Sequence, residues 1–268
     1  MKISKYFASV FNRFSKKDDD PNNEQAHVVD SKTPFAIREA YKALYTNVRY
    51  LNIEDKCKKI VVTSAVPGEG KTTLSVNLAV TLAQNLENKR ILLIDSDMRR
   101  PRVAPSLGLD PKGHGLSEYL AGIDEDPNFE YVDAHKLTVL TSGGSNVNPT
   151  KLIGSERMHK LLDACSQEFD YIIIDTPPVT VVTDAVLYNS NVNGYIIATR
   201  SEYSNTHKLS ECIASLEQVG AEIFGIVLSD IKMKGAGGKY SKYSKYSRYS
   251  RYSRYSRYAY SRYDNDSE

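Results

Sequence analysis

One segment decides the fold, Lys59-Ile-Val-Val-Thr-Ser-Ala-Val-Pro-Gly-Glu-Gly-Lys-Thr-Thr73, because it joins an apolar run to a glycine-rich turn that opens a helix. Its first six residues predict a strand, and apolar residues recur with a helical period over Thr72–Leu86. Gly68 and Gly70 allow backbone N–H groups to gather around phosphate oxygens at the positive N-terminus of that helix. The segment therefore predicts a phosphate-binding loop, although Ala65 occupies the position of the usual leading glycine.

Seven residues of this loop are candidates for binding a nucleotide: Pro67, Gly68, Glu69, Gly70, Lys71, Thr72 and Thr73. The Lys71 ammonium is expected to reach the β- and γ-phosphates. The Thr72 hydroxyl suits Mg²⁺, because this small hard cation takes few protein oxygens together with phosphate oxygens. The sequence therefore predicts ATP and Mg²⁺ as cofactors.

Strand-sized apolar runs alternate with helical patterns along the rest of the chain. The runs are Arg90–Asp95, Leu137–Thr141, Tyr171–Asp175, Gly194–Thr199 and Gly225–Leu228, and the helical patterns are Ile37–Leu51, Ser155–Glu168 and Thr206–Val219. The runs are mostly continuous Val, Ile and Leu, which is typical of parallel strands buried on both faces. This order predicts an α/β fold with three layers and a doubly wound, mostly parallel sheet.

Acidic residues stand where two of these strands end, Asp95 and Asp97 after one and Asp175 after the other. In doubly wound folds ligands bind at the carboxyl ends of the strands, so these carboxylates are expected beside the phosphate loop. Lys71, Asp95, Asp97 and Arg99 are the predicted catalytic residues. Either Asp95 or Asp97 can accept a proton from an attacking hydroxyl, and Arg99 can offset charge on a transferred phosphoryl group. The predicted metal ligands are Thr72, Asp97 and Asp175, the last in the position of a Walker B aspartate.

The composition, 268 residues of which 41% are hydrophobic, fits one folded domain with polar ends. The predicted parts are a polar leader at 1–33, a P-loop domain at 34–234, and a glycine linker with a tyrosine-rich tail at 235–268. The three cysteines lack metal-ligand spacing, and their odd number favours a reducing compartment. This cysteine usage predicts a cytoplasmic chain, and the apolar runs are shorter than the roughly 20 residues that a membrane-spanning helix requires.

The first 30 residues leave two interpretations open. Phe7, Val10, Phe11 and Phe14 lie at helical spacing among basic residues. This pattern is typical of an amphipathic helix on a membrane surface. The alternative is a polar leader that has no structure of its own.

With the lysine of the phosphate loop and the three strand-end aspartates in place, the sequence resembles the bacterial tyrosine kinases of polysaccharide export, in their split Gram-positive form. The resemblance covers roughly residues 34–232. Its motifs are Walker A at Ala65–Thr73, Walker A′ at Ile91–Asp97 and Walker B at Ile172–Pro178. It implies the partition-ATPase-like branch of the P-loop NTPases.

The resemblance also implies an ATP- and Mg²⁺-dependent protein-tyrosine kinase that autophosphorylates its tail between subunits and regulates capsule or exopolysaccharide polymerisation and export. The implied partners are a transmembrane polysaccharide co-polymerase, whose cytosolic C-terminal segment activates the kinase, and a phosphotyrosine phosphatase. Copies of the chain would form a homo-oligomer, such as a ring. The membrane partner would recruit the kinase to the inner face of the cell membrane.

One departure from the family concerns the contact between subunits. Members often carry Glu-x-x-Arg-x-x-Arg on the helix before the first strand, where this chain has Glu39, Lys42 and Tyr45. Lysine cannot reproduce a bidentate arginine contact, although Arg49 follows one turn later. Glu39 and Lys42 are nevertheless the predicted oligomer contacts.

The tail repeats Tyr-Ser-Lys/Arg with a strict period of three through Tyr258, which would align these tyrosines on one face of an extended polyproline-like chain. The predicted autophosphorylation sites are Tyr240, Tyr243, Tyr246, Tyr249, Tyr252, Tyr255, Tyr258, Tyr260 and Tyr263. Residues 239–268 hold eight basic and three acidic residues and therefore carry a net charge of +5. Because the whole chain carries +2, the rest of the chain carries −3. This distribution disfavours nucleic-acid binding by the domain. The alternative to a tail that is phosphorylated is a constitutive basic tail that binds anionic lipid, polysaccharide or single-stranded nucleic acid.

Two rival functions share the phosphate loop. The first is a partition-type ATPase switch, but such proteins typically carry a second lysine five residues before Lys71, where this chain has Val66. The second is a nucleotide-gated scaffold whose tail is phosphorylated by another kinase. Phosphate release without tail phosphotyrosine would indicate the ATPase.

Overall fold

The computed structural model describes residues 7–10, 28–144 and 148–231. The chain divides into two units, Met1–Ile231 and Lys232–Glu268, and all described residues belong to the first. The tail tyrosines and most of the N-terminal segment therefore lie outside the described residues, and the proposed domain boundary at 234 falls three residues beyond the first unit. No helix in the described part of the chain is long and apolar enough to cross a membrane.

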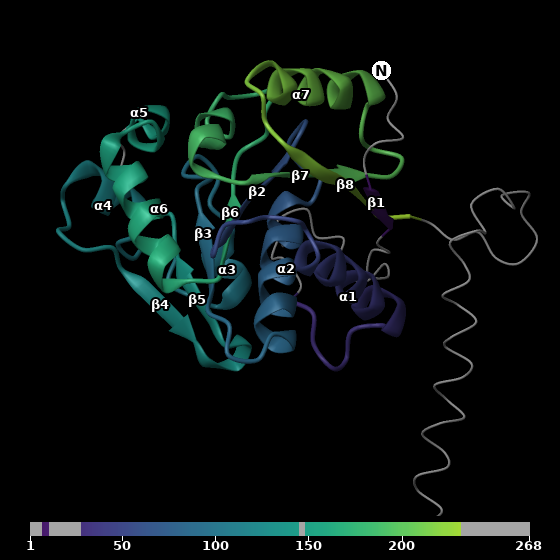
Figure 1. Ribbon diagram of the computed structural model, residues 1–268, viewed down its shortest axis with the longest axis horizontal. Helices are drawn as coiled ribbons and strands as arrows, with labels where there is room; N and C mark the ends of the chain where they lie inside the picture. Colours follow the sequence, from purple (N-terminus) through teal and green to yellow (C-terminus); the bar gives the residue numbers. More distant parts are fainter. Residues whose placement is uncertain (1–6, 11–27, 145–147, 232–268) are drawn as a thin grey trace, which may run out of the picture. The chain divides into compact units, whose positions relative to one another are not determined.

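Eight strands of the described residues form one sheet in the order β1-β8-β7-β2-β6-β3-β5-β4 (Figure 1). Their bounds are β1 Phe7–Val10, β2 Lys58–Ser64, β3 Ile91–Asp95, β4 Phe129–Val132, β5 Leu137–Leu140, β6 Tyr171–Asp175, β7 Gly194–Arg200 and β8 Ile223–Ser229. Neighbouring strands pair in parallel, except that β4 runs antiparallel to β5. The predicted doubly wound, mostly parallel sheet is confirmed.

Helices cover both faces of this sheet. The α-helices are α1 Phe35–Arg49, α2 Lys71–Asn85, α3 Val103–Leu107, α4 Leu116–Ala121, α5 Pro149–Ile153, α6 Glu156–Glu168 and α7 Thr206–Gln218, and the 3-10 helices are η2 Asp133–His135 and η3 Val186–Asn191. α1 and α2 lie side by side, and α7 lies on the other side of β7 and β8 (Figure 1). Ile172 and Ile174 of β6 join the core beneath α6 and α7, whereas Ile173 joins the core beneath α1 and α2. The continuous apolar sequence of the strand thus fills both layers.

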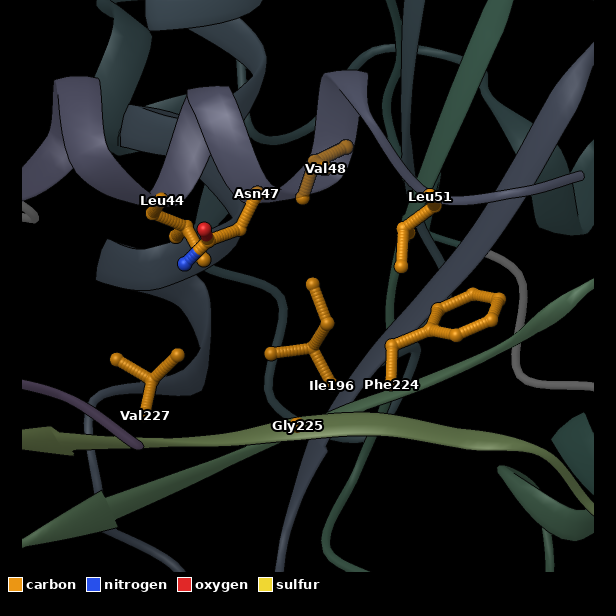
Figure 2. Close-up of a pocket in the computed structure, with 8 residues that line it drawn as sticks. All are labelled: Leu44, Asn47, Val48, Leu51, Ile196, Phe224, Gly225 and Val227. Atoms are coloured by element: carbon orange, nitrogen blue, oxygen red, sulfur yellow. The ribbon is translucent and has the colours of Figure 1, made fainter. Parts of the chain in front are cut away.

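α1 packs directly over β7 and β8. Figure 2 shows side chains of α1 and the loop after it facing these strands across a cavity of about 30 Å³, which is lined by Leu44, Asn47, Val48, Leu51, Ile196, Phe224, Gly225 and Val227. Space of this size holds about one water molecule, so the helix and the sheet are in close contact. The amphipathic pattern predicted over Ile37–Leu51 reflects this packing, since Ile37, Tyr41, Leu44 and Val48 are buried.

The six predicted strands and four predicted helices are present, with ends shifted by at most two residues. Four short elements were not predicted from the sequence, namely β4, α3, α4 and α5, because they are four to six residues long and too short to show a period.

For Phe7–Val10, both interpretations of the N-terminal segment, a membrane-surface helix and a leader without structure, are wrong. These residues form β1 and pair in parallel with Gly225–Leu228 of β8. The backbone groups of an unpaired strand edge are strong hydrogen-bonding sites, and pairing with them outweighs a weak helical spacing. Phe11 and Phe14 lie outside the described residues.

Candidate active site

The phosphate loop connects β2 to α2 through two left-handed glycines. Gly68 has φ +82° and Gly70 has φ +83°, a conformation that residues with a Cβ rarely adopt. Gly70 caps α2, and its carbonyl accepts a hydrogen bond from the Leu74 N–H at 2.9 Å. The loop therefore presents its backbone at the N-terminus of α2, as predicted for binding phosphate.

Three adjacent strands of the sheet, β2, β6 and β3, bring the predicted residues together. Asp95 ends β3 and Asp175 ends β6, and the two are partners in the strand register. The Ser96 N–H donates to the Asp175 carbonyl at 2.8 Å and extends this pairing. Because both strands lie on the same side of β2, their carboxylates meet beside the phosphate loop.

Lys71 and Thr72 each contact one of the predicted aspartates. The Lys71 Nζ lies 2.6 Å from Asp97 Oδ2, and the Thr72 hydroxyl donates to Asp175 Oδ2 at 2.6 Å. Ser75 Oγ donates to the other Asp175 oxygen at 3.0 Å. Ser75 was not among the residues predicted from the sequence, although its position three residues after Thr72 places it on the same helix face.

Asp95 has a different environment from the other two aspartates. One of its oxygens accepts hydrogen bonds from the backbone N–H groups of Val103 at 3.0 Å and Arg102 at 3.2 Å, at the start of α3. The other accepts from the Asp97 N–H at 3.2 Å. Asp95 therefore holds the Walker A′ turn in shape, whereas the Asp97 carboxylate contacts the phosphate-loop lysine.

Burial and mutual repulsion perturb the charges of the cluster. Burial, followed by repulsion from Asp175, raises the pKa of Asp95 to about 8. Burial also raises the pKa of Asp175, although Lys71 and Thr72 oppose the shift. Burial alone lowers the pKa of the Lys71 ammonium, but the Asp175 and Asp97 carboxylates outweigh it and the net shift is upward. The three carboxylates thus have too little positive charge near them, and the lysine is held protonated.

The excess of negative charge in this cluster favours the binding of a divalent cation. Asp95, Asp97 and Asp175 are at most 3% exposed, and the one ammonium among them is that of Lys71, which leaves two formal negative charges when all four groups are ionised. Oxygen ligands from carboxylates and a hydroxyl are those that Mg²⁺ prefers. Thr72, Asp97 and Asp175 are therefore suited to hold Mg²⁺ together with phosphate oxygens.

The guanidinium of Arg99 binds a buried carboxylate outside this cluster. Its Nε lies 3.0 Å from Asp184 Oδ2, and its Nη2 donates to Thr150 Oγ1 at 2.9 Å. Thr150 in turn donates to Asp184 at 2.6 Å, and Asp184 is completely buried. In the state described, Arg99 joins the Walker A′ turn to the start of α5, a contact that the sequence analysis did not predict.

The remaining candidates of the loop support its shape. The buried Glu69 carboxylate accepts hydrogen bonds from the Val66 N–H at 2.9 Å and from the Ser204 hydroxyl. The Pro67 carbonyl accepts from the Tyr203 hydroxyl at 2.9 Å, and the Thr73 carbonyl accepts from Asn77 Nδ2 at 2.9 Å. Neither Tyr203 nor Ser204 was predicted, because they follow β7, far from the loop in sequence.

The predicted oligomer contacts lie apart from this site on the exposed side of α1. Lys42 Nζ pairs with Glu39 Oε1 at 3.0 Å, and both side chains are about half exposed. The Tyr45 hydroxyl accepts from Arg49 at 3.0 Å. Arg49 thus reaches Tyr45, one turn earlier on the helix.

A left-handed glycine loop at a helix N-terminus, with a lysine and three strand-end aspartates around it, defines a P-loop nucleotide-binding protein. A family model described as an AAA domain matches residues 57–225. Tyrosine-protein kinase CpsD of Streptococcus pneumoniae is 35% identical over 199 residues, which are 72% of this chain and 84% of CpsD. The chain therefore belongs to the family of bacterial tyrosine-protein kinases, and the predicted resemblance is confirmed.

Longer relatives and a solved structure agree with this assignment. Tyrosine-protein kinase Etk of Escherichia coli is 32% identical over 229 residues, which are 82% of this chain but 31% of Etk, so this chain spans about a third of that protein. The solved kinase domain of Escherichia coli ETK is 28% identical with a TM-score of 0.75, and the match covers 89% of this chain and 95% of that domain.

Proposed function

We propose that this chain is an ATP- and Mg²⁺-dependent protein-tyrosine kinase that phosphorylates the tyrosine cluster at Tyr240–Tyr263 of a neighbouring copy. The observation that carries the proposal is the convergence of Lys71, Thr72, Asp97 and Asp175 on the phosphate loop. The names of the kinase relatives and the tyrosine-rich tail support tyrosine as the acceptor.

The contacts of the site residues support a role for each of them. Bound Mg²⁺ would neutralise charge on the phosphate oxygens, and Thr72, Asp97 and Asp175 would hold it. Lys71 is kept protonated by the carboxylates around it, so it is suited to bind the β- and γ-phosphates. Asp95 or Asp97 would accept the proton of the attacking tyrosine hydroxyl. Arg99 would act on the transferred phosphoryl group after leaving Asp184, or would position the Walker A′ turn through that ion pair.

The tail is suited to repeated phosphorylation. Eight of its nine tyrosines directly follow a lysine or an arginine, and each phosphate adds about −1.5 to −2 charges. Full modification would change the tail from +5 to roughly −8 to −13. This reversal would regulate assembly, so the phosphorylated and unphosphorylated proteins should differ in oligomer size by light scattering.

The process and partners are proposed by analogy with the kinase family to which this chain belongs. We propose a role in capsule or exopolysaccharide polymerisation and export, with a transmembrane polysaccharide co-polymerase as activator and a phosphotyrosine phosphatase as antagonist. The chain would work on the cytoplasmic side, where the co-polymerase recruits it to the membrane. Glu39 and Lys42 would contribute to contacts in a homo-oligomeric ring, and the domain would not bind nucleic acid.

One assay separates the proposal from its rivals. Purified protein is incubated with Mg²⁺ and ATP, with and without the cytosolic segment of a candidate membrane partner, and phosphotyrosine and free phosphate are measured. We expect phosphotyrosine in the tail, and a Lys71→Met variant should lose it. Free phosphate without phosphotyrosine would indicate a partition-type ATPase. Phosphotyrosine that forms only when an unrelated kinase is added would indicate a nucleotide-gated scaffold.

A further inference from the structure

The loop after β7 holds the phosphate loop from the side opposite the aspartates. The Tyr203 hydroxyl donates to the Pro67 carbonyl at 2.9 Å. A Cβ placed on Gly68 would lie 2.9 Å from the Tyr203 hydroxyl oxygen, so the tyrosine fits there because residue 68 is glycine. Tyr203 therefore rests directly on the left-handed turn of the phosphate loop.

A second contact joins the same two loops. Ser204 Oγ donates to the buried Glu69 carboxylate and also accepts from the Arg200 N–H at 2.7 Å. Residues 203 and 204 thus bind the phosphate loop at two successive points, Pro67 and Glu69. These contacts join segments more than 130 residues apart in sequence and fix the loop before a nucleotide arrives. Binding to a fixed loop loses less conformational entropy than binding to a mobile one.

Tyr203 is also accessible and lies beside an arginine. The residue is 53% exposed, and the Arg200 guanidinium lies 5.3 Å from its ring centroid. Arg200 Nε pairs with Asp230 at 3.0 Å, which leaves further guanidinium donors on a side chain that is 27% exposed. A phosphate on the Tyr203 oxygen would have an arginine within reach, whereas the esterified oxygen can no longer donate to Pro67.

We propose that Tyr203 is a latch on the phosphate loop and a phosphorylation site outside the tail, and that its phosphorylation weakens nucleotide binding. This inference rests on the proposed kinase function for its phosphoryl donor. Phosphorylation would break the hydrogen bond to Pro67 and place about two negative charges beside the loop that binds nucleotide phosphates. The kinase would thereby reduce its own affinity for ATP.

The transfer would take place between copies, because the Tyr203 hydroxyl rests on the outside of its own phosphate loop. Its oxygen attacks the γ-phosphorus of ATP bound in a second copy. The bond from that phosphorus to the bridging oxygen of ADP breaks, and ADP leaves with the electron pair. The phenolic proton passes to the Asp95–Asp97 pair of the second copy.

The test of modification uses wild-type protein as donor and Lys71→Met protein as acceptor, with Mg²⁺ and ATP. Trypsin releases residues 201–208, Ser-Glu-Tyr-Ser-Asn-Thr-His-Lys, in which Tyr203 is the one tyrosine, and fragment-ion spectra distinguish it from the serines and the threonine of this peptide. We expect phosphate on this peptide of the acceptor. Phosphate on the tail peptides alone would overturn the inference and leave the proposed function intact. No phosphotyrosine on any peptide would overturn both.

The test of the latch measures Mg·ADP affinity by calorimetry on phosphatase-treated protein, and it needs no kinase activity. Tyr203→Phe removes one hydroxyl and should weaken binding about three- to tenfold, while the melting temperature falls by no more than about 5 °C. Tyr50→Phe is the matched control, because Tyr50 is 74% exposed and also lies under an arginine, at 5.6 Å, but belongs to the end of α1. It should bind like wild type. Equal affinity of Tyr203→Phe and wild type would overturn the latch.

The effect of the phosphate itself is measured after autophosphorylation. Phosphorylated wild type should bind Mg·ADP at least tenfold more weakly than its phosphatase-treated form. Autophosphorylated Tyr203→Phe carries phosphate on the tail alone and should keep the affinity of its untreated form. A similar loss in both proteins would assign the effect to the tail and overturn the inference.

Discussion

The two ends of β6 carry one aspartate each, and the surroundings of these two carboxylates shift their pKa values in opposite directions. Asp170, just before the strand, accepts from Lys89 Nζ at 2.8 Å and from the Arg90 N–H at 2.9 Å. Burial alone would raise the pKa of Asp170, but the hydrogen bonds from Lys89 and Arg90 outweigh it and lower the pKa. Asp175, at the other end, is completely buried near two further carboxylates, and burial raises its pKa.

The difference separates residues that stabilise the fold from residues that serve the site. At the amino end, Asp170 pairs with Lys89, and the Lys58 ammonium donates to backbone carbonyls. At the carboxyl end, three buried carboxylates share one lysine, which disfavours the folded state in the absence of a cation. Such an arrangement persists because the site requires it. Mutations at the two ends should therefore affect different properties.

The largest expected effect is on activity at the carboxyl end. Asp175→Asn keeps the shape of the side chain but removes a charge from the predicted metal site, so tail phosphorylation should fall about 10²-fold or more. Asp170→Asn removes the aspartate at the other end of the same strand, and its activity should stay within about twofold of wild type. Initial rates of phosphotyrosine formation at saturating Mg²⁺ measure both. Equal losses would contradict the division between the ends.

The pH dependence of stability sharpens the comparison. The pKa of Asp95 is about 8 in the folded protein against 3.8 for an ordinary aspartate, so the folded state binds more protons between these values and loses stability as pH rises through this window. Asp95→Asn removes this loss. The introduced amide nitrogen cannot accept the backbone hydrogen bonds of the carboxylate oxygen that it replaces, which lowers the stability of the variant by an amount that does not depend on pH. In EDTA the free energy of unfolding of the variant relative to wild type should therefore rise by about 1–3 kcal/mol from about pH 4 to about pH 8 and then level off.

Asp170→Asn should show the opposite trend. Its folded pKa is lowered, so the wild-type aspartate contributes stability above pH 3.8 and loses it as pH falls through the folded pKa. The variant should therefore be less stable than wild type at neutral pH and equal to it in strong acid. Urea unfolding in EDTA at several pH values measures both variants. Parallel pH profiles for the two would show that the ends do not differ in electrostatics.

Local rules predicted the parts of the site that are close in sequence. Lys71 and Thr72 follow from the glycine turn, and Asp95 and Asp175 follow from the rule that strand ends meet at one edge. Contacts across long separations were not predictable in this way. Arg99 binds Asp184, 85 residues away, and Glu69 binds Ser204, 135 residues away. No period or motif marks such partners, because the relative placement of loops depends on the packed sheet.

The same reasoning explains the error at the N-terminus. Phe7 and Val10 are three residues apart, which suits a helix, but a strand of four residues gives too few positions to reveal its own period. The partner of this strand is β8, more than 200 residues later. Pairing over such a distance is decided by the free edge of the sheet.

Stability at the amino end should depend on Lys58. Its ammonium donates to the carbonyls of Arg49 at 2.7 Å and Leu51 at 2.9 Å, at and just beyond the C-terminus of α1. Lys58→Met keeps the aliphatic chain and should lower the free energy of unfolding by about 1–2 kcal/mol, because the carbonyls lose a charged donor. Urea unfolding measures this loss, and the rate of tail phosphorylation should not change. Lys89→Met, on a side chain that is 49% exposed, should lower the free energy of unfolding by less than about 1 kcal/mol.

The smallest effect is expected on the outer face of α1. Glu39 and Lys42 are about half exposed and pair at 3.0 Å, a kind of contact that contributes little. Lys42→Ala should change the free energy of unfolding by less than about 0.5 kcal/mol. If Lys42 also contacts a neighbouring subunit, the variant should form smaller oligomers in light scattering while its monomer remains folded. An unchanged oligomer size would remove Lys42 from the subunit contact and leave α1 with a role in packing against the sheet.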